Sequence, residues 1–527
     1  MSETSGKSST VGQDAEKPYR YKYRNVMIMD DVEDLEDYEP GGLAPLDIGD
    51  TLGDRFQIIY KLGYGGIATI WLCWELATEK WRAVKVNAAS RSSDDCPDLM
   101  AMQHMKEHGV TQEQLEANHI VMPLETFWEE TPNGRHLCSV LPVLGPKLLD
   151  WRSDVLGKDV ERVDTDRVDD LCYQVAEGLS FLHSKGLCHG DFRPQNILMK
   201  LKPGCLDHLS RDDMCDILGT PDSANVWTTT GGRSEHAPRE VVIAAAWQRI
   251  QDFVIDEVAI VDFGEAYKAN DRPKDFGIPP PYASPEVLFN KGRVGFESDV
   301  WSLAATLLEV RINRRGGDDA ADAIRCYERF AGPIPPYYRS EAKQILIDHE
   351  LDIADEDDQD SDSASGALQL LTGPLDLAWD WQEERDAEAK GFSHPLEMRL
   401  GAEQFAYGLE PHPQRPGRQR TMLLRYHLSR DEVLDFSDLL RQMFKYKPEE
   451  RISTTQVLSH RWFKRQHASR KERRSILKNH WIGPAIIGLL AFVIWVLWNR
   501  PRGAATETPK KGEGYIPWNA IILFFFL

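Results

Sequence analysis

The chain has 527 residues, 42% of them hydrophobic, and a formal net charge of −22. This length and composition are typical of a large globular protein and exclude a collagen-like or wholly disordered one. Nucleic-acid affinity comes from basic groups that neutralise phosphates, so no direct nucleic-acid partner is expected for so acidic a chain. The eight cysteines form no C-x-x-C pair, which favours reduced thiols in the cytosol or nucleus.

The charge is distributed unevenly. Residues 461–527 contain 12 Lys or Arg and 3 Asp or Glu, a net of +9, so the first 460 residues carry −31. Residues 1–40 are polar, hold seven carboxylates between Asp30 and Glu39, and are expected to be a disordered acidic N-terminus. No secretory signal is expected there, because the first residues lack an apolar core.

Strands are predicted first along the chain, from about residue 52. Residues 56–75 (FQIIYKLGYGGIATIWLCWE) predict two strands around a glycine turn. Residues 81–86 (WRAVKV) predict a third strand, and residues 136–145 (HLCSVLPVLG) predict another.

Helices are predicted to follow. Leu99, Met102 and Met105 recur at helical spacing, and residues 168–186 place four apolar side chains on one helical face. Those four are Leu171, Val175, Leu179 and Leu182. Strands first and helices afterwards indicate a two-lobed α+β architecture.

The strand-rich part carries a glycine motif and a lysine. The motif Gly63-Tyr64-Gly65-Gly66-Ile67-Ala68 lies between two predicted strands, where glycines let backbone N–H groups approach phosphates. Lys85 follows in the third strand. Taken alone, the motif also fits a plain hairpin turn, and the lysine also fits a sheet edge.

The helical part carries a denser set of motifs. His189-Gly190-Asp191-Phe192-Arg193-Pro194-Gln195-Asn196 places a carboxylate and an amide five residues apart, which suits proton acceptance and metal coordination. Ile260-Val261-Asp262-Phe263-Gly264 puts another carboxylate at a strand end. Ser284-Pro285-Glu286, Asp299 and Arg451 follow. Because these motifs occur in this order and at these spacings, a chance arrangement is a poor explanation.

In this order the motifs resemble those of a eukaryotic-type protein kinase over roughly residues 52–466. Further features are similar to the SR-protein kinases of the CMGC group, closest to the fungal members. These features are residues 38–50 (YEPGGLAPLDIGD), the -TIWL- strand at 69–72, the hinge-like residues 143–145 and the long insertion before Asp262.

The resemblance implies an α+β, two-lobed protein kinase fold. The kinase domain would span 41–466, with a small β-rich N-lobe over about 52–144 and a large helical C-lobe over about 145–466. Insertions are expected at about 201–257 and 348–420.

The resemblance also implies residue roles, with ATP and Mg²⁺ as cofactors. Asp191 is expected to accept the proton of the substrate hydroxyl, with Lys85 and Arg193 as further catalytic residues, and Asn196 and Asp262 are expected to hold Mg²⁺. The expected nucleotide-binding residues are Leu62, Gly63, Tyr64, Gly65, Gly66, Ala68, Ile70, Ala83, Lys85, Asp98, Leu141, Val143 and Leu144. Glu286 is expected to pair with Arg451, and Asp299 to hold the catalytic loop. The implied reaction is phosphate transfer to serine or threonine of a protein substrate, of a basic Arg/Ser-rich kind if the SR-kinase likeness extends to substrates.

Five positions depart from the kinase pattern. The helical register of Leu99, Met102 and Met105 places Asp98 where a longer glutamate would pair with Lys85. Ala68 replaces a glycine, Gly190 and Arg193 replace an arginine and a lysine, and Pro279 replaces a threonine. The alternative of a membrane-anchored pseudokinase scaffold with little phosphate transfer therefore stays open. Residues 265–283 contain no Ser or Thr, and the arginine that would bind an activation-loop phosphate is also missing, so we expect activity without such phosphorylation.

The tail contains a candidate membrane segment. Residues 481–498 (WIGPAIIGLLAFVIWVLW) carry no charge and would span about 27 Å as a helix, near the hydrocarbon thickness of a bilayer. They predict a transmembrane helix, with a buried core helix as the alternative. The basic linker 467–480 predicts a cytosolic kinase domain, and residues 499–527 would be a tail with an apolar end. A single-pass membrane location is expected, or the cytoplasm or nucleus if the segment is not inserted; the oligomeric state is not predicted.

Two acidic runs bear on the substrate. Residues 30–39 and 348–362 have the charge that attracts a basic protein. They fit solvated, disordered segments at least as well.

Overall fold

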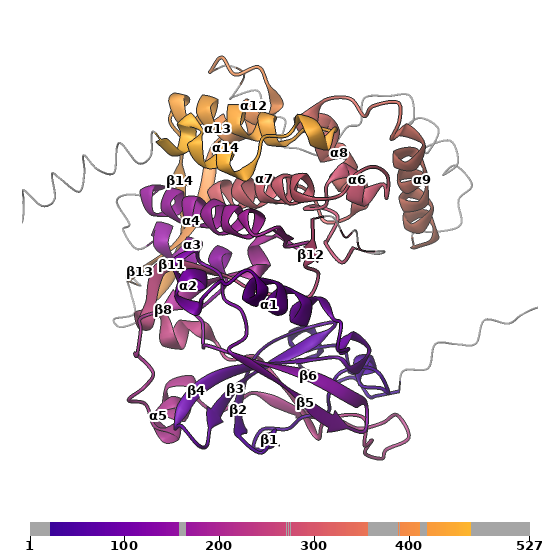
Figure 1. The fold of residues 1–527 in the computed structure, drawn as a ribbon, viewed down its shortest axis with the longest axis vertical. Coiled ribbons are helices and arrows are strands. Elements are labelled where there is room, and N and C mark those ends of the chain that lie inside the picture. Colours follow the sequence, from indigo (N-terminus) through magenta and orange to yellow (C-terminus); the bar gives the residue numbers. More distant parts are fainter. Residues whose placement is uncertain are drawn as a thin grey trace, which may run out of the picture. The chain divides into compact units, whose positions relative to one another are not determined.

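The computed structural model describes residues 22–464 except for 158–164, 270, 272, 274–275, 357–387, 389 and 412–418. These residues all belong to one compact unit, Met1–Gln466. Within it a β-rich lobe and a helical lobe follow each other in the chain (Figure 1). The two-lobed α+β prediction is therefore confirmed.

The smaller lobe is built on a six-stranded antiparallel sheet of order β1-β2-β3-β4-β6-β5. One face buries an apolar cluster that includes Phe56, Ile58, Trp71, Val84 and Val140. The strands are β1 (Thr51–Leu52), β2 (Phe56–Gly65), β3 (Ala68–Glu75), β4 (Lys80–Asn87), β5 (Glu125–Thr131) and β6 (Gly134–Leu141). Helices α1 (Pro97–Glu107) and α2 (Gln112–Ala117) lie between β4 and β5 in the chain.

The larger lobe packs around helices α4 (Thr165–Ser184) and α7 (Phe296–Ile312). The four residues predicted on one face of the first of these are all completely buried, which explains the apolar spacing. The other helices are α3 (Leu148–Gly157), α6 (Pro285–Leu288), α8 (Ala320–Ala331), α9 (Arg339–Glu356), α12 (Pro395–Gly401), α13 (Arg430–Met443) and α14 (Thr454–Ser459).

Two short antiparallel pairs carry the loops of the site. Strand β7 (Leu187–Cys188) pairs with β12 (Tyr267–Lys268), and β8 (Ile197–Leu201) pairs with β11 (Val254–Ile260). The loop 189–196 lies between β7 and β8, and residues 261–266 lie between β11 and β12. Both loops are therefore fixed at each end by a strand.

The prediction of disorder up to residue 40 is wrong for residues 22–40. Tyr23, Val32, Leu35 and Tyr38 are buried, and short 3₁₀ helices form at Met29–Asp31 and Leu35–Asp37. The apolar residues interleaved with the acidic run supply the buried surface that a disordered segment lacks. Residues 1–21 lie outside the described residues.

The first predicted insertion, 201–257, folds onto the smaller lobe. It contains α5 (Arg211–Leu218), β9 (Ser223–Asn225), β10 (Glu240–Val242) and the 3₁₀ helix Trp247–Phe253. Its Leu209 and Met214 are buried in one cluster with Tyr60 and Trp81 of the sheet, and the Trp81 indole donates to the Leu209 carbonyl at 3.0 Å. The insertion is thus an ordered part of the fold.

The second predicted insertion, 348–420, is described only in part. The end of α9 and all of α12 fall within it, and strand β13 (Gln404–Pro411) pairs with β14 (Gln419–Tyr426) in an antiparallel hairpin. The rest of the acidic run beyond residue 356 lies outside the described residues.

The predicted transmembrane helix 481–498 and its flanks 467–480 and 499–527 also lie outside the described residues. Within the described part of the chain, no helix is both long enough and apolar enough to cross a membrane.

Candidate active site

The glycine motif forms the turn between β2 and β3. Gly63 and Gly65 pair across the hairpin with Ile70 and Ala68. No other residue comes within 4 Å of the point where a side chain would start on Gly63, Gly65 or Gly66, so the turn faces open space. A phosphate group can therefore approach its backbone.

Lys85 of β4 lies beside two carboxylates. Its Nζ is 2.7 Å from Asp262 Oδ1 and 3.7 Å from Asp98 Oδ1. Burial lowers the pKa of Lys85, but the two carboxylates outweigh burial and the pKa is raised overall. The structure thus places Asp98, in the first turn of α1, where the sequence predicted the acidic partner of Lys85.

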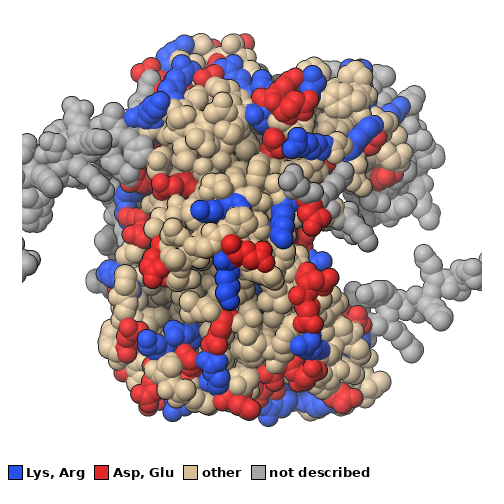
Figure 2. Space-filling view, in the orientation of Figure 1, with Lys and Arg blue, Asp and Glu red and all other residues tan. Residues whose placement is uncertain are grey.

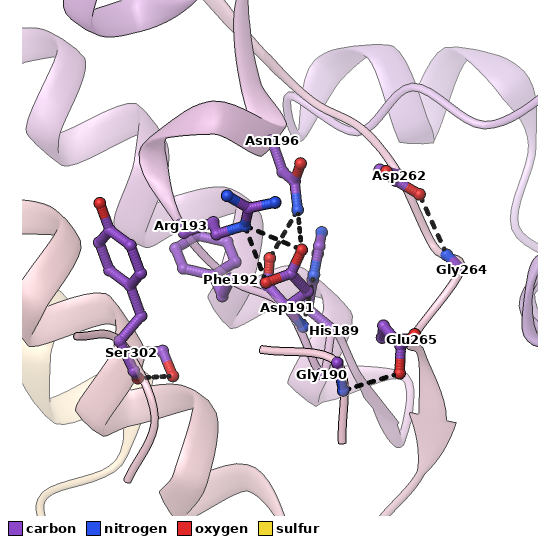
Figure 3. A network of polar contacts seen from close by, with 12 residues as sticks. His189, Gly190, Asp191, Phe192, Arg193, Asn196, Asp262, Gly264, Glu265 and Ser302 are labelled. Atoms are coloured by element: carbon purple, nitrogen blue, oxygen red, sulfur yellow. Dashed lines mark hydrogen bonds and ion pairs between the residues drawn. The ribbon is translucent and has the colours of Figure 1, made fainter. Parts of the chain in front are cut away.

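Asp262 is held ionised at the end of the β11 strand. Burial raises the pKa of its carboxyl, but Lys85 outweighs burial and lowers it to about 2. Its φ is 66°, a left-handed conformation that costs a non-glycine residue free energy and often marks functional sites. The Gly264 N–H donates to Asp262 Oδ1 at 3.3 Å (Figure 3).

Asp191 is clamped by two neighbours in its own loop (Figure 3). Arg193 Nε donates to both of its carboxylate oxygens at 2.9 Å, and Asn196 Nδ2 donates to Oδ2 at 2.7 Å. Burial raises the pKa of Asp191, and Arg193 opposes that rise. The carboxylate is therefore oriented before any substrate arrives.

The two loops are joined directly. The Val261 N–H donates to the Asn196 carbonyl at 3.0 Å, which sets Asp262 beside Asn196. Because Asn196 donates to Asp191 through its amide nitrogen, its amide oxygen is the atom that it can offer a cation. Asp262 likewise has Oδ2 beyond the oxygen that contacts Lys85. One amide and one carboxylate oxygen fit Mg²⁺, which takes few protein ligands and completes its shell with phosphate and water.

The loops rest on buried polar groups of the larger lobe. Asp299 accepts from the backbone N–H groups of His189 and Gly190 at 2.8 and 3.1 Å. Glu286 and Arg451 form a two-point ion pair at 2.6 Å with both side chains completely buried. Both contacts were expected from the sequence.

The residues expected around the nucleotide base lie at the junction of the lobes. Ala83 and Leu141 are register partners on β4 and β6. Leu62 and Val143 pack against one apolar cluster, and the Gly145 N–H donates to the Met199 carbonyl at 2.8 Å. The chain after Val143 and Leu144 is thereby tied to β8.

The remaining predicted residues lie on the same hairpin. Tyr64 is exposed at 41%, Ala68 is buried and Ile70 is partly buried. All predicted site residues thus fall within the described part of the chain, and their roles in binding stay predictions.

Sequence reasoning missed three residues around this site. Asn87, two residues after Lys85 on β4, donates to Asp98 Oδ2 at 3.5 Å. Arg91 contacts the carboxylate of Glu265, the residue after Gly264. The alternation of a strand was enough to put Asn87 on the face of Lys85. No sequence signal connects Arg91 with a residue 174 positions away.

The missing arginine at position 190 has a structural reason. Gly190 has a φ of 80°, and a Cβ placed there would lie 2.0 Å from the Glu265 carbonyl oxygen. No residue with a side chain fits this backbone without a shift of residue 265.

A family model described as the protein kinase domain matches residues 56–207 and 250–463. The chain is 29% identical to SRSF protein kinase 3 of Mus musculus over 220 residues, 40% of this chain and 36% of that protein. It is 31% identical to protein kinase dsk1 of Schizosaccharomyces pombe over 181 residues, 34% of this chain and 32% of that protein. It is 27% identical to the serine/threonine-protein kinase SRPK of Physarum polycephalum over 293 residues, 53% of this chain and 65% of that protein. The chain spans less than two thirds of the length of each of these relatives.

The matched range contains Lys85, Asp191, Asn196 and Asp262, and its gap coincides with most of the insertion that packs on the smaller lobe. Protein kinases use ATP and Mg²⁺. The donor set of Asn196 and Asp262 fits such an ion. The chain belongs to the protein kinase family, and it is similar to the SRPK-type members of that family.

Proposed function

We propose that this protein is an ATP-dependent serine/threonine protein kinase of the SR-protein-kinase type. The observation that carries the proposal is that two pairs, Lys85 with Asp262 and Asn196 with Asp191, lie in one site. The hydrogen bond from the Val261 N–H to the Asn196 carbonyl joins the two pairs. The Physarum relative is named as a serine/threonine-protein kinase, which agrees with this activity.

Each residue has a task in this reaction. Lys85 exchanges Asp262 for the α- and β-phosphates of ATP, and Asp191 orients the substrate hydroxyl and accepts its proton. Arg193 keeps the Asp191 carboxylate in place and favours its ionised form. Asn196 and Asp262 would hold Mg²⁺, which neutralises charge on the transferred phosphate when bound. The acceleration comes from positioning and charge stabilisation.

The enzyme is proposed to act without phosphorylation of its activation segment. Glu265 Oε2 accepts from the Gly277 N–H at 3.1 Å while Arg91 contacts the same carboxylate, so a fixed negative charge already links the smaller lobe to this segment. Phosphatase treatment should leave the activity unchanged, and Glu265→Gln should lower it. A phosphatase-sensitive activity that Glu265→Gln does not affect would contradict this proposal.

The proposed substrates are basic, Arg/Ser-rich proteins. Support comes from the SRPK-type relatives and from the charge of −31 on residues 1–460. Figure 2 shows acidic and basic side chains interspersed over one face, so this charge is not gathered there in a single patch. Peptides with Ser beside Arg should be better substrates than the same peptides with Gln for Arg, and equal rates would remove the Arg/Ser proposal.

The protein is further proposed to be anchored in a membrane by residues 481–498, with the kinase domain in the cytosol. The support is the uncharged stretch itself and its strongly basic N-terminal flank. A tagged full-length chain should sediment with membranes and resist carbonate extraction, whereas a chain lacking residues 479–527 should not. A full-length chain that stays in the soluble fraction, like the shortened chain, would place the protein in the cytoplasm or nucleus instead.

The activity itself is tested with the purified full-length protein. Asp191→Asn should lower phosphate transfer from ATP by at least about 100-fold, because it removes the proton acceptor. Asp54→Asn, in the exposed turn before β2, is the matched control and should keep full activity. Equal transfer by the wild type and Asp191→Asn would contradict the proposal, and no transfer by either is the result expected of a pseudokinase scaffold.

A further inference from the structure

Two residues before the glycine motif, a lysine is sealed inside the smaller lobe. Lys61 lies on β2, immediately ahead of Leu62, and its side chain is 0% exposed. Its ammonium forms an ion pair with Glu33, whose side chain is 1% exposed. Glu33 belongs to the ordered segment that precedes the sheet.

The carboxylate of Glu33 has a second fixed partner. Tyr38 donates its hydroxyl to Glu33 Oε1 while Lys61 contacts Oε2, so both oxygens are satisfied. Burial lowers the pKa of Lys61, and Glu33 counteracts this effect. Removing Glu33 would therefore leave a buried ammonium without its counter-charge. An unpaired buried charge is strongly destabilising, so the ammonium would move toward solvent.

Lys61 is also coupled to the turn that follows it. Its Nζ lies 5.3 Å from the ring centroid of Tyr64, which is part of the turn, and 5.6 Å from that of Trp71 on β3. Its carbonyl oxygen accepts from the Ala245 N–H at 2.8 Å, so the first insertion holds the backbone while Glu33 holds the side chain. Lys61 is thus held at both ends by segments outside the range 56–207 and 250–463 that matches the kinase family.

The segment that carries Glu33 is itself anchored. Val32, Leu35 and Tyr38 are buried in one cluster with Val226 and Val241 of the insertion. Glu33 therefore stands on a fixed support, which a positioning residue requires.

We propose that Glu33 is a positioning residue for the nucleotide-binding turn. It acts through Lys61, whose location sets the course of residues 62–66 and the place of Tyr64. The inference rests on the proposed function, because it assigns that turn to ATP. Loss of Glu33 frees the buried ammonium, displaces the start of the turn and weakens nucleotide binding.

The test compares full-length Glu33→Gln with Glu39→Gln, which removes the same charge from an exposed position in the same segment. Nucleotide affinity is measured with a non-hydrolysable ATP analogue and Mg²⁺, so the readout does not need phosphate transfer. Glu33→Gln should weaken the affinity by about tenfold, and Glu39→Gln should not change it. If the wild type binds the analogue but transfers no phosphate, the proposed function fails. The present inference is then still decided by the ratio of the analogue affinities of the wild type and Glu33→Gln.

A second measurement separates positioning from general loss of stability. Hydrogen exchange of residues 62–68 should speed up in Glu33→Gln while exchange in β4 and β6 stays as in the wild type. The double variant Glu33→Gln, Lys61→Met removes both charges and should regain most of the lost affinity. Unchanged affinity in Glu33→Gln, exchange that speeds up equally throughout the sheet, or no recovery in the double variant would each overturn the proposal.

Discussion

Two lysines of the same sheet are paired with carboxylates in opposite ways. Lys61 of β2 meets Glu33 with both side chains at most 1% exposed, whereas Lys85 of β4 meets Asp262, whose side chain is 36% exposed. In the first pair, both oxygens of Glu33 are occupied, one by Lys61 and the other by Tyr38. In the second pair, Lys85 lies near two carboxylates, those of Asp262 and Asp98. The difference shows which pair is built to stay closed and which is built to exchange partners when a phosphate arrives.

Replacing Lys85 should have the largest effect on activity. Lys85→Met should lower kcat/KM for phosphate transfer by about 1000-fold, because the counter-charge of the ATP phosphates is lost. The pKa of Asp262 should rise, since the strongest of the contacts that lower it is then lost. Steady-state kinetics test this effect, with Lys80→Met at the exposed start of β4 as control. A loss below tenfold would show that Lys85 is not the phosphate-binding cation.

Replacing Lys61 should instead lower the stability of the folded protein. Lys61→Met leaves the Glu33 carboxylate buried without its counter-charge, so the free energy of unfolding should fall by about 3–5 kcal/mol. Urea unfolding measures this change, and the same Lys80→Met variant serves as control. If Lys85→Met destabilised the protein as much as Lys61→Met, the distinction between the two pairs would be lost.

The catalytic loop offers a pH test. Burial raises the pKa of Asp191 above 3.8 and Arg193 lowers it, so removing Arg193 should raise it further. Since the base must be ionised, Arg193→Ala should move the acidic limb of the kcat/KM profile to higher pH and lower the plateau by about tenfold. Arg193→Lys should move the limb less. An unmoved limb in Arg193→Ala would mean that this arginine does not act on Asp191.

Effects no larger than this are expected at Asp98, the second partner of Lys85, and at its neighbour Asn87. Asn87 and Lys85 approach the two oxygens of Asp98 at 3.5 and 3.7 Å, at the edge of contact distance. Asp98→Ala should therefore lower kcat/KM by about tenfold and Asn87→Ala by about threefold, as weak contacts allow. Asp98→Glu should keep full activity. A Glu variant less active than Asp98→Ala would show that the shorter side chain is required.

The grouping of the site residues could be predicted because it depends on short motifs. Asp191 and Asn196 are five residues apart, and the loop that joins them fixes their geometry. Asp98 was found through the helical spacing of its neighbours, and the structure places it beside Lys85. These are local relations that a linear pattern preserves.

The parts that were missed depend on distant contacts. Glu33 and Lys61 are 28 residues apart, and nothing in an acidic run marks which carboxylate is buried. The disorder expected for residues 22–40 was wrong because the surface that covers Tyr23 and Val32 comes partly from Val226 and Val241, about two hundred positions later. The composition of such a segment gives its charge, but it does not show which distant apolar residues will cover it.

The sealed pair of Glu286 and Arg451 has a consequence for how the protein is made. A chain leaves the ribosome from its N-terminus, so Glu286 emerges 165 residues before its partner. At about 5–20 residues per second this interval lasts roughly 10–30 seconds, during which the larger lobe cannot close over the carboxylate. Residue 481 follows Arg451 by only 30 positions. Arg451 and the start of the apolar tail therefore emerge within roughly 2–6 seconds of each other at the same rate of synthesis.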